Sequence, residues 1–285
     1  MTEEMRHSPR PPRRRSVLIR RHSAVTRLTH WLNVLCLGIL LLSGLQIFNA
    51  YPRLHWGQYG ADDDPAILTI GAGGSNGEPQ GFIRIAGVSV PTTGVLGLSK
   101  MDGEWTPRAF PAWLTLPSYQ DLAAGRRWHF FFAWVFVVNG LAYLGYGLVS
   151  RHIRRDLVPD RHELSPRHLW REIVDHARLR FPSGEQARRY NALQKLAYIV
   201  VIGALLPLMV LTGLTMSPGV DAAFPVLLDI FGGRQSARTL HFITASLLVA
   251  FVVVHVAMVI LSGPWNNLRS MVTGRYAIRQ ERPDA

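Results

Sequence analysis

The chain has 285 residues, of which 48% are hydrophobic and 18% are charged, and its formal net charge is +12. The basic residues flank apolar runs and form no DNA- or RNA-binding motif, so we exclude nucleic acid as a partner. The single cysteine, Cys36, excludes an internal disulfide, and the chain has no glycine-rich nucleotide loop or serine-hydrolase motif.

Four apolar runs are each long enough for the roughly 20 residues that a membrane-spanning helix needs. None of them contains Asp, Glu, Lys or Arg, and they cover residues 28–48, 128–149, 196–216 and 239–262. The first run contains His30 and lacks a small-residue cleavage site, so we interpret it as a retained helix and not as a signal peptide. The sequence therefore predicts an all-α, integral-membrane four-helix bundle.

The basic residues also predict the orientation of the four spans. Of the 31 Lys and Arg residues, 23 lie before the first run, in the connection 150–195 or after the last run, and 8 lie in the other two connections. By the positive-inside rule both termini and the middle connection are cytoplasmic, where the cations meet anionic membrane lipid. We divide the chain into a basic cytoplasmic tail, 1–23, and a membrane domain, 24–285.

Two connections are expected to carry structure of their own. The outer connection, 49–127, is rich in Gly and Pro, and the alternation in FIRIAGVSV with the Pro-Thr-Thr-Gly turn that follows it predicts a short hairpin. Its aromatic residues are equally consistent with a folded cap that docks a partner and with an interfacial aromatic belt. In the connection 150–195, Ser165 and Pro166 begin an amphipathic helix that we expect to lie on the membrane surface. In the third span, Pro207 is expected to kink the helix.

Histidines inside the spans are the main functional signal, because an intramembrane imidazole requires a partner or a cofactor. His241 and His255 share one predicted helix and, 14 residues apart, lie on one face at depths about 21 Å apart. His129 begins the second span on the outer side, and His30 begins the first span on the inner side. Depth alone therefore pairs His129 with His241 and His30 with His255.

Two pairs of imidazoles on facing helices are what two b-type haems require as axial iron ligands. The chain has no CxxCH motif, so such haems are bound noncovalently. Three arginines lie beside the outer pair and are candidates for contacts with haem propionates or, alternatively, with lipid phosphates: Arg126, Arg127 and Arg238.

The segments RLTHWLN, GRRWHFFFAWVFVVNG and LHFITASLLVAFVVVH resemble the bacterial cytochrome b561 group, which includes the cytochrome b subunits of nickel-iron hydrogenases, formate dehydrogenase and thiosulfate reductase. The resemblance implies a dihaem subunit of the bacterial inner membrane that carries electrons between the quinone pool and a periplasmic partner. The outer connection with WLTLPSYQDLAAGRRWHFFFAW looks most like subunits that accompany molybdopterin oxidoreductases.

The same resemblance implies a quinone site near the inner haem, for which the candidates are His22, Arg27 and Asn33. The alternative, which is favoured because dedicated sites are rare, is that His22 meets lipid headgroups and Asn33 bonds a neighbouring helix. Three other functions stay open at this point. They are the cytochrome b subunit of a nickel-iron hydrogenase, a stand-alone quinone or superoxide oxidoreductase, and a membrane transporter or anchor without haem. No inverted repeat or broken helix pair supports transport.

Overall fold

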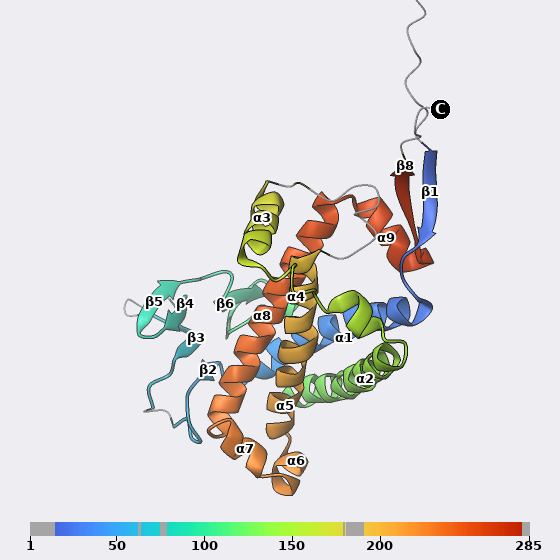
Figure 1. Cartoon of the computed structure of the whole chain (residues 1–285). Helices are drawn as coiled ribbons and strands as arrows, with labels where there is room; N and C mark the ends of the chain where they lie inside the picture. The colour runs from blue at the N-terminus through green and yellow to red at the C-terminus, as the bar shows by residue number, and fades with distance from the viewer. Residues whose placement is uncertain (1–14, 62–63, 75–78, 179, 181–190, 281–285) are drawn as a thin grey trace, which may run out of the picture.

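The computed structural model describes residues 15–61, 64–74, 79–178, 180 and 191–280 (Figure 1). Four helical segments in it are long and apolar enough to cross a membrane, as predicted. They are α1 (Ala24–Phe48), α2 (Leu122–Val149), the third segment Ala192–Thr215, and α8 (Arg234–Leu261). The described residues are mostly helical, and the four apolar helices identify a membrane protein.

Each of these helices begins four to six residues before the apolar run that predicted it, and in the first three a polar side chain caps the start, whereas α8 follows Gly233 without a side-chain cap. The Ser23 Oγ atom accepts a hydrogen bond from the Thr26 backbone N (3.1 Å), and the Asp121 Oδ1 atom accepts one from Ala124 N (2.8 Å). Asn191 begins the third segment with a capping box. Hydropathy marks the part of a helix that hydrocarbon surrounds, whereas the N-cap residue marks where helical hydrogen bonding begins.

The third segment is irregular in the middle, as Pro207 predicted. It consists of α4 (Ala192–Val200), a π-helical turn η4 (Val201–Leu205) and α5 (Leu206–Thr215). Proline has no N–H to donate, and its ring collides with the carbonyl four residues earlier. The wider π-helical turn accommodates both effects immediately before Pro207.

The segment between α1 and α2, which we call the cap (residues 49–121), corrects the all-α prediction. Four strands form an antiparallel sheet in the order β2 (Arg53–Leu54), β3 (Leu68–Gly73), β4 (Gln80–Ile85) and β5 (Val88–Pro91). A second hairpin pairs β6 (Gly97–Met101) with β7 (Glu104–Arg108), and a short helix η1 (Ala112–Leu114) follows. A hairpin is present in the predicted stretch, but its turn is not the predicted Pro-Thr-Thr-Gly: β4 and β5 pair within FIRIAGVSV and turn through Ala86 and Gly87, both with positive φ.

The cap is folded onto the ends of two membrane helices. Its core joins Leu54, Ile70, Ala109 and Phe110 to Phe48 at the end of α1, and Phe242 of α8 packs against the same cluster. Backbone contacts extend this attachment, since Gln235 N and Ser236 N, at the start of α8, both donate to the carbonyl of Gly57. The cap therefore covers one end of the helical bundle.

The opposite end of the bundle carries shorter elements. A π-helical turn η2 (Ile153–Leu157) and the amphipathic helix α3 (Pro166–Ala177) follow α2, and α3 begins at the predicted Pro166. After α8 come helix α9 (Pro264–Thr273) and strand β8 (Arg275–Gln280). Strand β8 pairs with β1 (Arg15–Arg20), a part of the predicted basic tail, so the first and last described strands lie side by side. Residues 1–14 of that tail lie outside the described residues.

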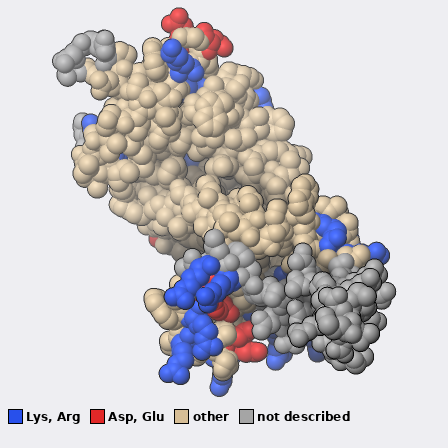
Figure 2. Space-filling model, turned by 90° about the horizontal axis from the view of Figure 1, so that it is seen from above, with Lys and Arg blue, Asp and Glu red and all other residues tan. Residues whose placement is uncertain are grey.

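Within the bundle, α1 packs along α2, and α5 packs along α8. Helices α6 (Pro218–Ala223) and α7 (Val226–Ile230) connect α5 to α8 at the cap end. Figure 2 shows a broad band without Lys, Arg, Asp or Glu, with the charged residues gathered toward the rims of the face in view. This distribution agrees with the placement of the four apolar helices in a membrane.

Candidate functional site

The structure brings the four intramembrane histidines together in two pairs. His129 of α2 and His241 of α8 have ring centroids 6.3 Å apart, with 63° between the ring planes, and we call them the outer pair. His30 of α1 and His255 of α8 have centroids 6.5 Å apart, with 54° between the planes, and we call them the inner pair. Helix α8 thus contributes one imidazole to each pair, while α1 and α2 contribute one each.

A hydroxyl group from a neighbouring helix orients His129. The Ser43 Oγ atom of α1 lies 3.1 Å from His129 Nδ1 and also donates to the Ile39 carbonyl at 2.6 Å. Because the hydroxyl proton goes to that carbonyl, Oγ accepts from the ring, so Nδ1 carries the proton. The Nε2 lone pair of His129 is then available to a metal, and no hydrogen bond from a described residue occupies it.

His241 is oriented in the same way by the other helix pair. The Thr212 Oγ1 atom of α5 lies 3.0 Å from His241 Nδ1 and donates to the Leu208 carbonyl at 2.6 Å. The same argument places the proton on Nδ1 of His241 and leaves its Nε2 lone pair available. Each helix pair therefore fixes the tautomer of its own outer histidine.

A glycine follows each of these hydroxyl residues and makes room for the imidazole. A Cβ atom on Gly44 would lie 3.4 Å from His129 Cε1, and one on Gly213 would lie 3.2 Å from His241 Cε1. The outer histidines are consequently held by two matching dipeptides, Ser43–Gly44 and Thr212–Gly213. Gly38, Gly140 and Gly203 have open space where a Cβ would lie, so they play no such part.

The inner pair has a different environment. The His30 ring meets Trp31 edge-on at 5.3 Å, and the His255 ring is stacked on Phe251 at 5.8 Å. The buried Nδ1 atom of His30 has no hydrogen-bond partner among the described residues. Aromatic packing surrounds the inner rings, whereas hydrogen bonds hold the outer ones.

The arginines predicted beside the outer pair have different surroundings. Arg238 donates to the backbone carbonyls of Arg53 and Tyr51, and its guanidinium also lies over the ring of Phe48 at 5.3 Å. Its contacts therefore tie α8 to the cap. Arg126 and Arg127 are exposed in the first turns of α2.

Two of the three residues predicted for quinone binding are engaged by the protein itself. Arg27 donates to the Val272 carbonyl of α9, and Asn33 Oδ1 accepts from Asn139 Nδ2 of α2 at 2.7 Å. His22 lies before α1 and has no hydrogen bond from a described residue. Burial, assisted by the nearby charge of Arg21, lowers the pKa of His22 to about 4, so its imidazole is neutral at pH 7.

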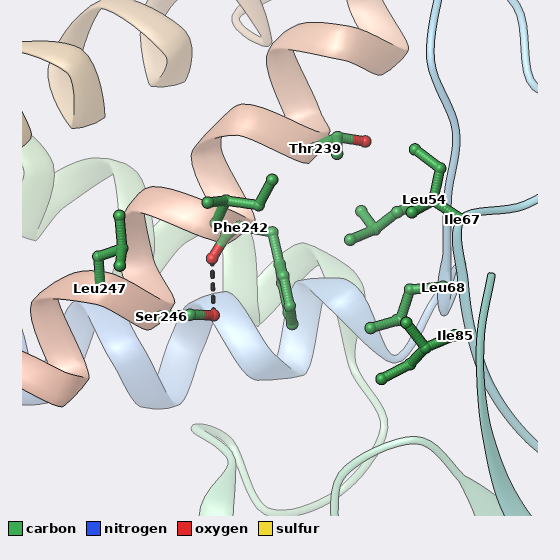
Figure 3. A pocket seen from close by; sticks show the side chains of 9 residues that line it. Leu54, Ile67, Leu68, Ile85, Thr239, Phe242, Ser246 and Leu247 are labelled. Atoms are coloured by element: carbon green, nitrogen blue, oxygen red, sulfur yellow. Dashed lines mark hydrogen bonds between the residues drawn. The ribbon is translucent and has the colours of Figure 1, made fainter. Parts of the chain in front are cut away.

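A cavity of about 270 Å³ lies away from all of these groups, between the cap and α8 (Figure 3). Leucine and isoleucine side chains from β2, β3 and β4 face Phe242, Ile243 and Leu247 of α8 across it. Its hydroxyl groups are already bonded, since Thr239 donates to the His55 carbonyl and Ser246 to the Phe242 carbonyl. At 100° per residue, these α8 positions lie on the face opposite His241, so the cavity is separate from the histidine pairs.

Comparison with known proteins gives these observations a family. Residues 21–274 match the family model described as prokaryotic cytochrome b561. The chain belongs to this family. A relative from Azospira oryzae, the putative protein-methionine-sulfoxide reductase subunit YedZ1, is 30% identical over 240 residues, which cover 84% of this chain and 90% of the relative. No solved structure gives a significant match.

This prokaryotic cytochrome b561 is thus a membrane electron-transfer subunit of a family that binds b-type haem, as the resemblance predicted. The spacing of its histidines fits such a group. A metal–nitrogen bond of about 2 Å and about 1.2 Å from nitrogen to ring centroid put two imidazoles on opposite sides of one iron about 6.4 Å apart. The observed 6.3 and 6.5 Å agree with this value.

Sequence reasoning missed Ser43 and Thr212. Both occur in short signals, SG in the first span and TG in the third. A hydroxyl in a membrane helix usually bonds its own preceding carbonyl, as these two also do, so their sequence positions alone do not reveal the bond to a histidine.

Proposed function

We propose that this cytochrome b561 holds two b-type haems and passes electrons between the quinone pool and an oxidoreductase bound at the cap side. In this proposal His129 and His241 are the axial ligands of an outer haem, and His30 and His255 are those of an inner haem. The observation that carries it is the occurrence of two imidazole pairs, each spaced for one iron, at two depths along α8.

The arrangement suits electron transfer across a membrane. His241 and His255 are 14 residues apart on one continuous helix, which separates the two pairs by about 21 Å. Bound haem supplies one-electron chemistry, and the protein supplies its position and surroundings. The chain's own part is to hold four imidazoles in place, with Ser43 and Thr212 keeping the outer Nε2 atoms unprotonated.

We place both termini, and with them the inner pair, in the cytoplasm, and the cap in the periplasm of the inner membrane. The basic residues before α1, between α2 and α4, and after α8 support this orientation. Quinone then exchanges electrons near the inner pair. His22 is our candidate for accepting a proton released when quinol is oxidised, since its imidazole is neutral at pH 7 and is not engaged as Arg27 and Asn33 are.

The partner that we propose is a periplasmic catalytic subunit of the molybdopterin type. The relative is named as a subunit of a protein-methionine-sulfoxide reductase, and that name supports a partner which reduces oxidised methionine in proteins. Two electrons and two protons convert a sulfoxide to a thioether and water. Electrons then flow from quinol through the inner and outer pairs to the partner.

Quinol-driven haem reduction tests this function. The purified protein in lipid nanodiscs is mixed anaerobically with a short-chain quinol, and the b-type absorption band is followed. We expect reduction by quinol, slower in His22→Gln, with complete reduction of both proteins by dithionite. A protein without any b-type band would contradict the cytochrome proposal and favour a haem-free transporter or anchor.

Affinity purification from the native membrane identifies the partner. A molybdopterin subunit in the complex supports the proposal, and a nickel-iron hydrogenase subunit would replace that partner class. A protein that oxidises quinol continuously without any copurified subunit would instead be a stand-alone oxidoreductase.

A further inference from the structure

Arg108, at the end of β7 in the cap, is a buried arginine with an unusual set of partners. Its side chain is only 4% exposed. The Nε atom donates to the Phe110 carbonyl (2.9 Å). One terminal nitrogen donates to the Ser118 carbonyl (2.8 Å) and to Met101 Sδ (3.5 Å). The other terminal nitrogen donates to Thr115 Oγ1 (2.9 Å) and to Gln46 Oε1 (3.3 Å). All five N–H groups of the guanidinium are therefore used.

None of these partners carries a negative charge. Burial lowers the pKa of Arg108, but an arginine stays protonated in a protein interior, so a full positive charge remains there. Removing a charge from water without pairing it is costly. In the low dielectric of the interior, such a charge interacts more strongly with nearby groups than it would in water.

The charge contacts α1 about one helical turn from Ser43, through Gln46. Gln46, which accepts from Arg108, is 2% exposed and follows Ser43 by three residues, on the same face of α1. Ser43 is the residue that orients His129. On α2, a Cβ atom on Gly125 would lie 3.0 Å from Gln46 Cγ, and Gly125 precedes His129 by one helical turn. Gln46 thus connects the guanidinium to the α1–α2 contact that carries the outer pair.

We propose that Arg108 is a fixed positive charge that raises the reduction potential of the outer haem relative to the inner one. This inference rests on the proposed function. Reduction of a haem adds one electron, so a nearby positive charge favours the reduced form. Because its N–H groups are all used by the cap and by Gln46 of α1, Arg108 acts through space, without bonding a haem propionate. The effect favours electron transfer from the inner haem to the outer one.

The test is a spectroelectrochemical titration of the full protein in nanodiscs. The wild type is expected to show two one-electron transitions, and the outer one is assigned by its loss in His241→Ala. In Arg108→Gln the outer transition moves to lower potential and the inner one stays. Gln46→Glu gives the same shift without removing the arginine, because a carboxylate beside the guanidinium compensates its charge.

Two controls separate charge from packing. Arg108→Lys keeps the charge and should leave the outer transition near its wild-type potential. Arg84→Gln removes an exposed arginine from the same cap and should move neither transition.

Four outcomes overturn the inference. The first is an unchanged outer transition in Gln46→Glu with haem content intact, and the second is an equal shift of both transitions in Arg108→Gln or Gln46→Glu. The third and fourth are shifts in Arg108→Lys or in Arg84→Gln that are as large as the shift in Arg108→Gln. Should Arg108→Gln fail to fold, Gln46→Glu alone decides. A wild type with fewer than two haems would instead refute the proposed function.

Discussion

The four histidines differ in how firmly the protein orients them. His129 and His241 each donate from Nδ1 to a hydroxyl on a neighbouring helix, and that hydroxyl is itself fixed by a backbone carbonyl. Hydrogen bonds of this kind orient a metal ligand and raise its basicity, and removing one typically costs 10- to 100-fold in metal affinity. The outer site is therefore the more preorganised of the two.

Removing both hydroxyls is expected to weaken the outer haem site selectively. Ser43→Ala with Thr212→Val should lower outer haem affinity by about 10- to 100-fold per lost bond, through disordered ligands. The haem content that remains after extensive washing measures the loss of affinity, and electron paramagnetic resonance of the oxidised protein reports the disorder of the ligands. Ser246→Ala is the matched control, because its hydroxyl makes the same kind of local bond to Phe242 O on the opposite face of α8. Equal haem loss in the control would contradict the assigned role.

The close approach of Gly213 to the His241 ring provides a second test of the outer site. In Gly213→Ala the new methyl lies 3.2 Å from His241 Cε1, so the ring must move, and we expect partial loss of the outer haem. Gly203→Ala, in the same span, adds a methyl to open space and should retain both haems. Difference spectra of the two variants decide the matter, and indistinguishable spectra would count against a tight fit at Gly213.

Histidine pairing could be predicted from the sequence, because depth in a membrane is a linear function of position along a helix. Contacts that depend on helix rotation could not be predicted in this way. The sequence placed Arg238 beside the outer pair, but only the folded cap shows that its guanidinium bonds the carbonyls of Arg53 and Tyr51. Ser43 and Thr212 escaped prediction for the same reason.

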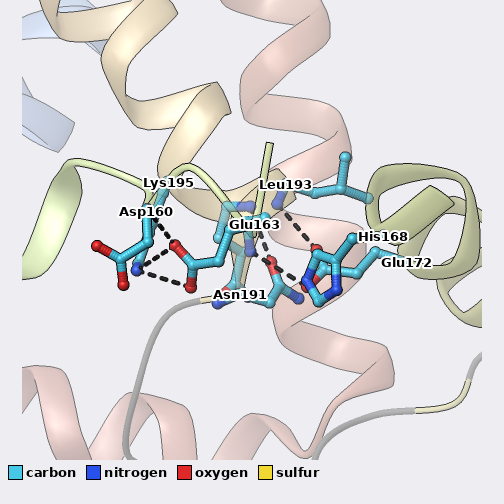
Figure 4. Close-up of polar contacts among 9 residues, drawn as sticks. Asp160, Glu163, His168, Glu172, Asn191, Leu193 and Lys195 are labelled. Carbon is cyan, nitrogen blue, oxygen red and sulfur yellow. Dashed lines mark hydrogen bonds and ion pairs between the residues drawn. The ribbon is translucent and has the colours of Figure 1, made fainter. Parts of the chain in front are cut away.

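At the scale of elements, a polar corner joins α3 to α4 (Figure 4). The Lys195 ammonium donates to both carboxylate oxygens of Glu163, at 2.9 and 2.8 Å. The Glu172 carboxylate accepts from the backbone N atoms of Ala192 and Leu193, at 3.2 and 3.0 Å, and so caps α4. An anion at this position also interacts favourably with the helix dipole. The corner fixes the start of the third span.

The charge on Glu163 makes this corner sensitive to acid. Burial alone would raise the pKa of Glu163, but the hydrogen bonds from Lys195 and the Asp160 backbone lower it below the usual value. A lowered pKa means that the stabilisation is present at neutral pH and is lost as pH falls through that lowered pKa. We expect lower protection factors, which are corrected for the intrinsic exchange rate at each pH, at the start of α4 in that acidic range, and already at pH 7 in Glu163→Gln.

The loss should be no more than about 1 kcal/mol, because the pair is partly solvated. Exchange of the α8 amides serves as the internal reference. If Glu163→Gln left exchange in α4 at the wild-type rate, the pair would have no measurable role.

Elements in the membrane were easier to predict than those outside it. The four spans follow from hydropathy, since hydrocarbon requires long apolar helices. The cap strands are short and stabilised by contacts with each other and with Phe48 and Phe242, which lie far away in the sequence. One hairpin, β4–β5, showed a clear alternating pattern, and the other strands did not.

In the molecule as a whole, the first and last described strands pair with each other. Strand β1 pairs with β8, and Asn266 of α9 makes two hydrogen bonds with the backbone of Ala277, accepting at 2.9 Å and donating at 3.0 Å. Trp31 Nε1 of α1 donates to the Met271 carbonyl at 3.0 Å. The Trp31 bond joins the helix that carries His30 to α9, which follows the helix that carries His255. These contacts hold the inner end of the bundle as the cap holds the outer end.

Breaking this connection should loosen β8. Asn266→Ala removes both bonds to Ala277 and is expected to cost about 1–3 kcal/mol locally, which amide exchange in β1 and β8 would report. Asn267→Ala is the control, because that side chain bonds Ser262 Oγ and nearby carbonyls without touching β8. Equal exchange in the two variants would mean that Asn266 does not fasten the strand.

Haem stoichiometry in histidine variants tests the two-pair arrangement. We expect two b-type haems per chain in the wild type, and one in His241→Ala, His129→Ala, His30→Ala and His255→Ala. The first two variants should lose the same spectral component, and the last two should lose the other. Retention of both haems in His241→Ala, or loss of the same component in His241→Ala and His255→Ala, would contradict the two-pair arrangement.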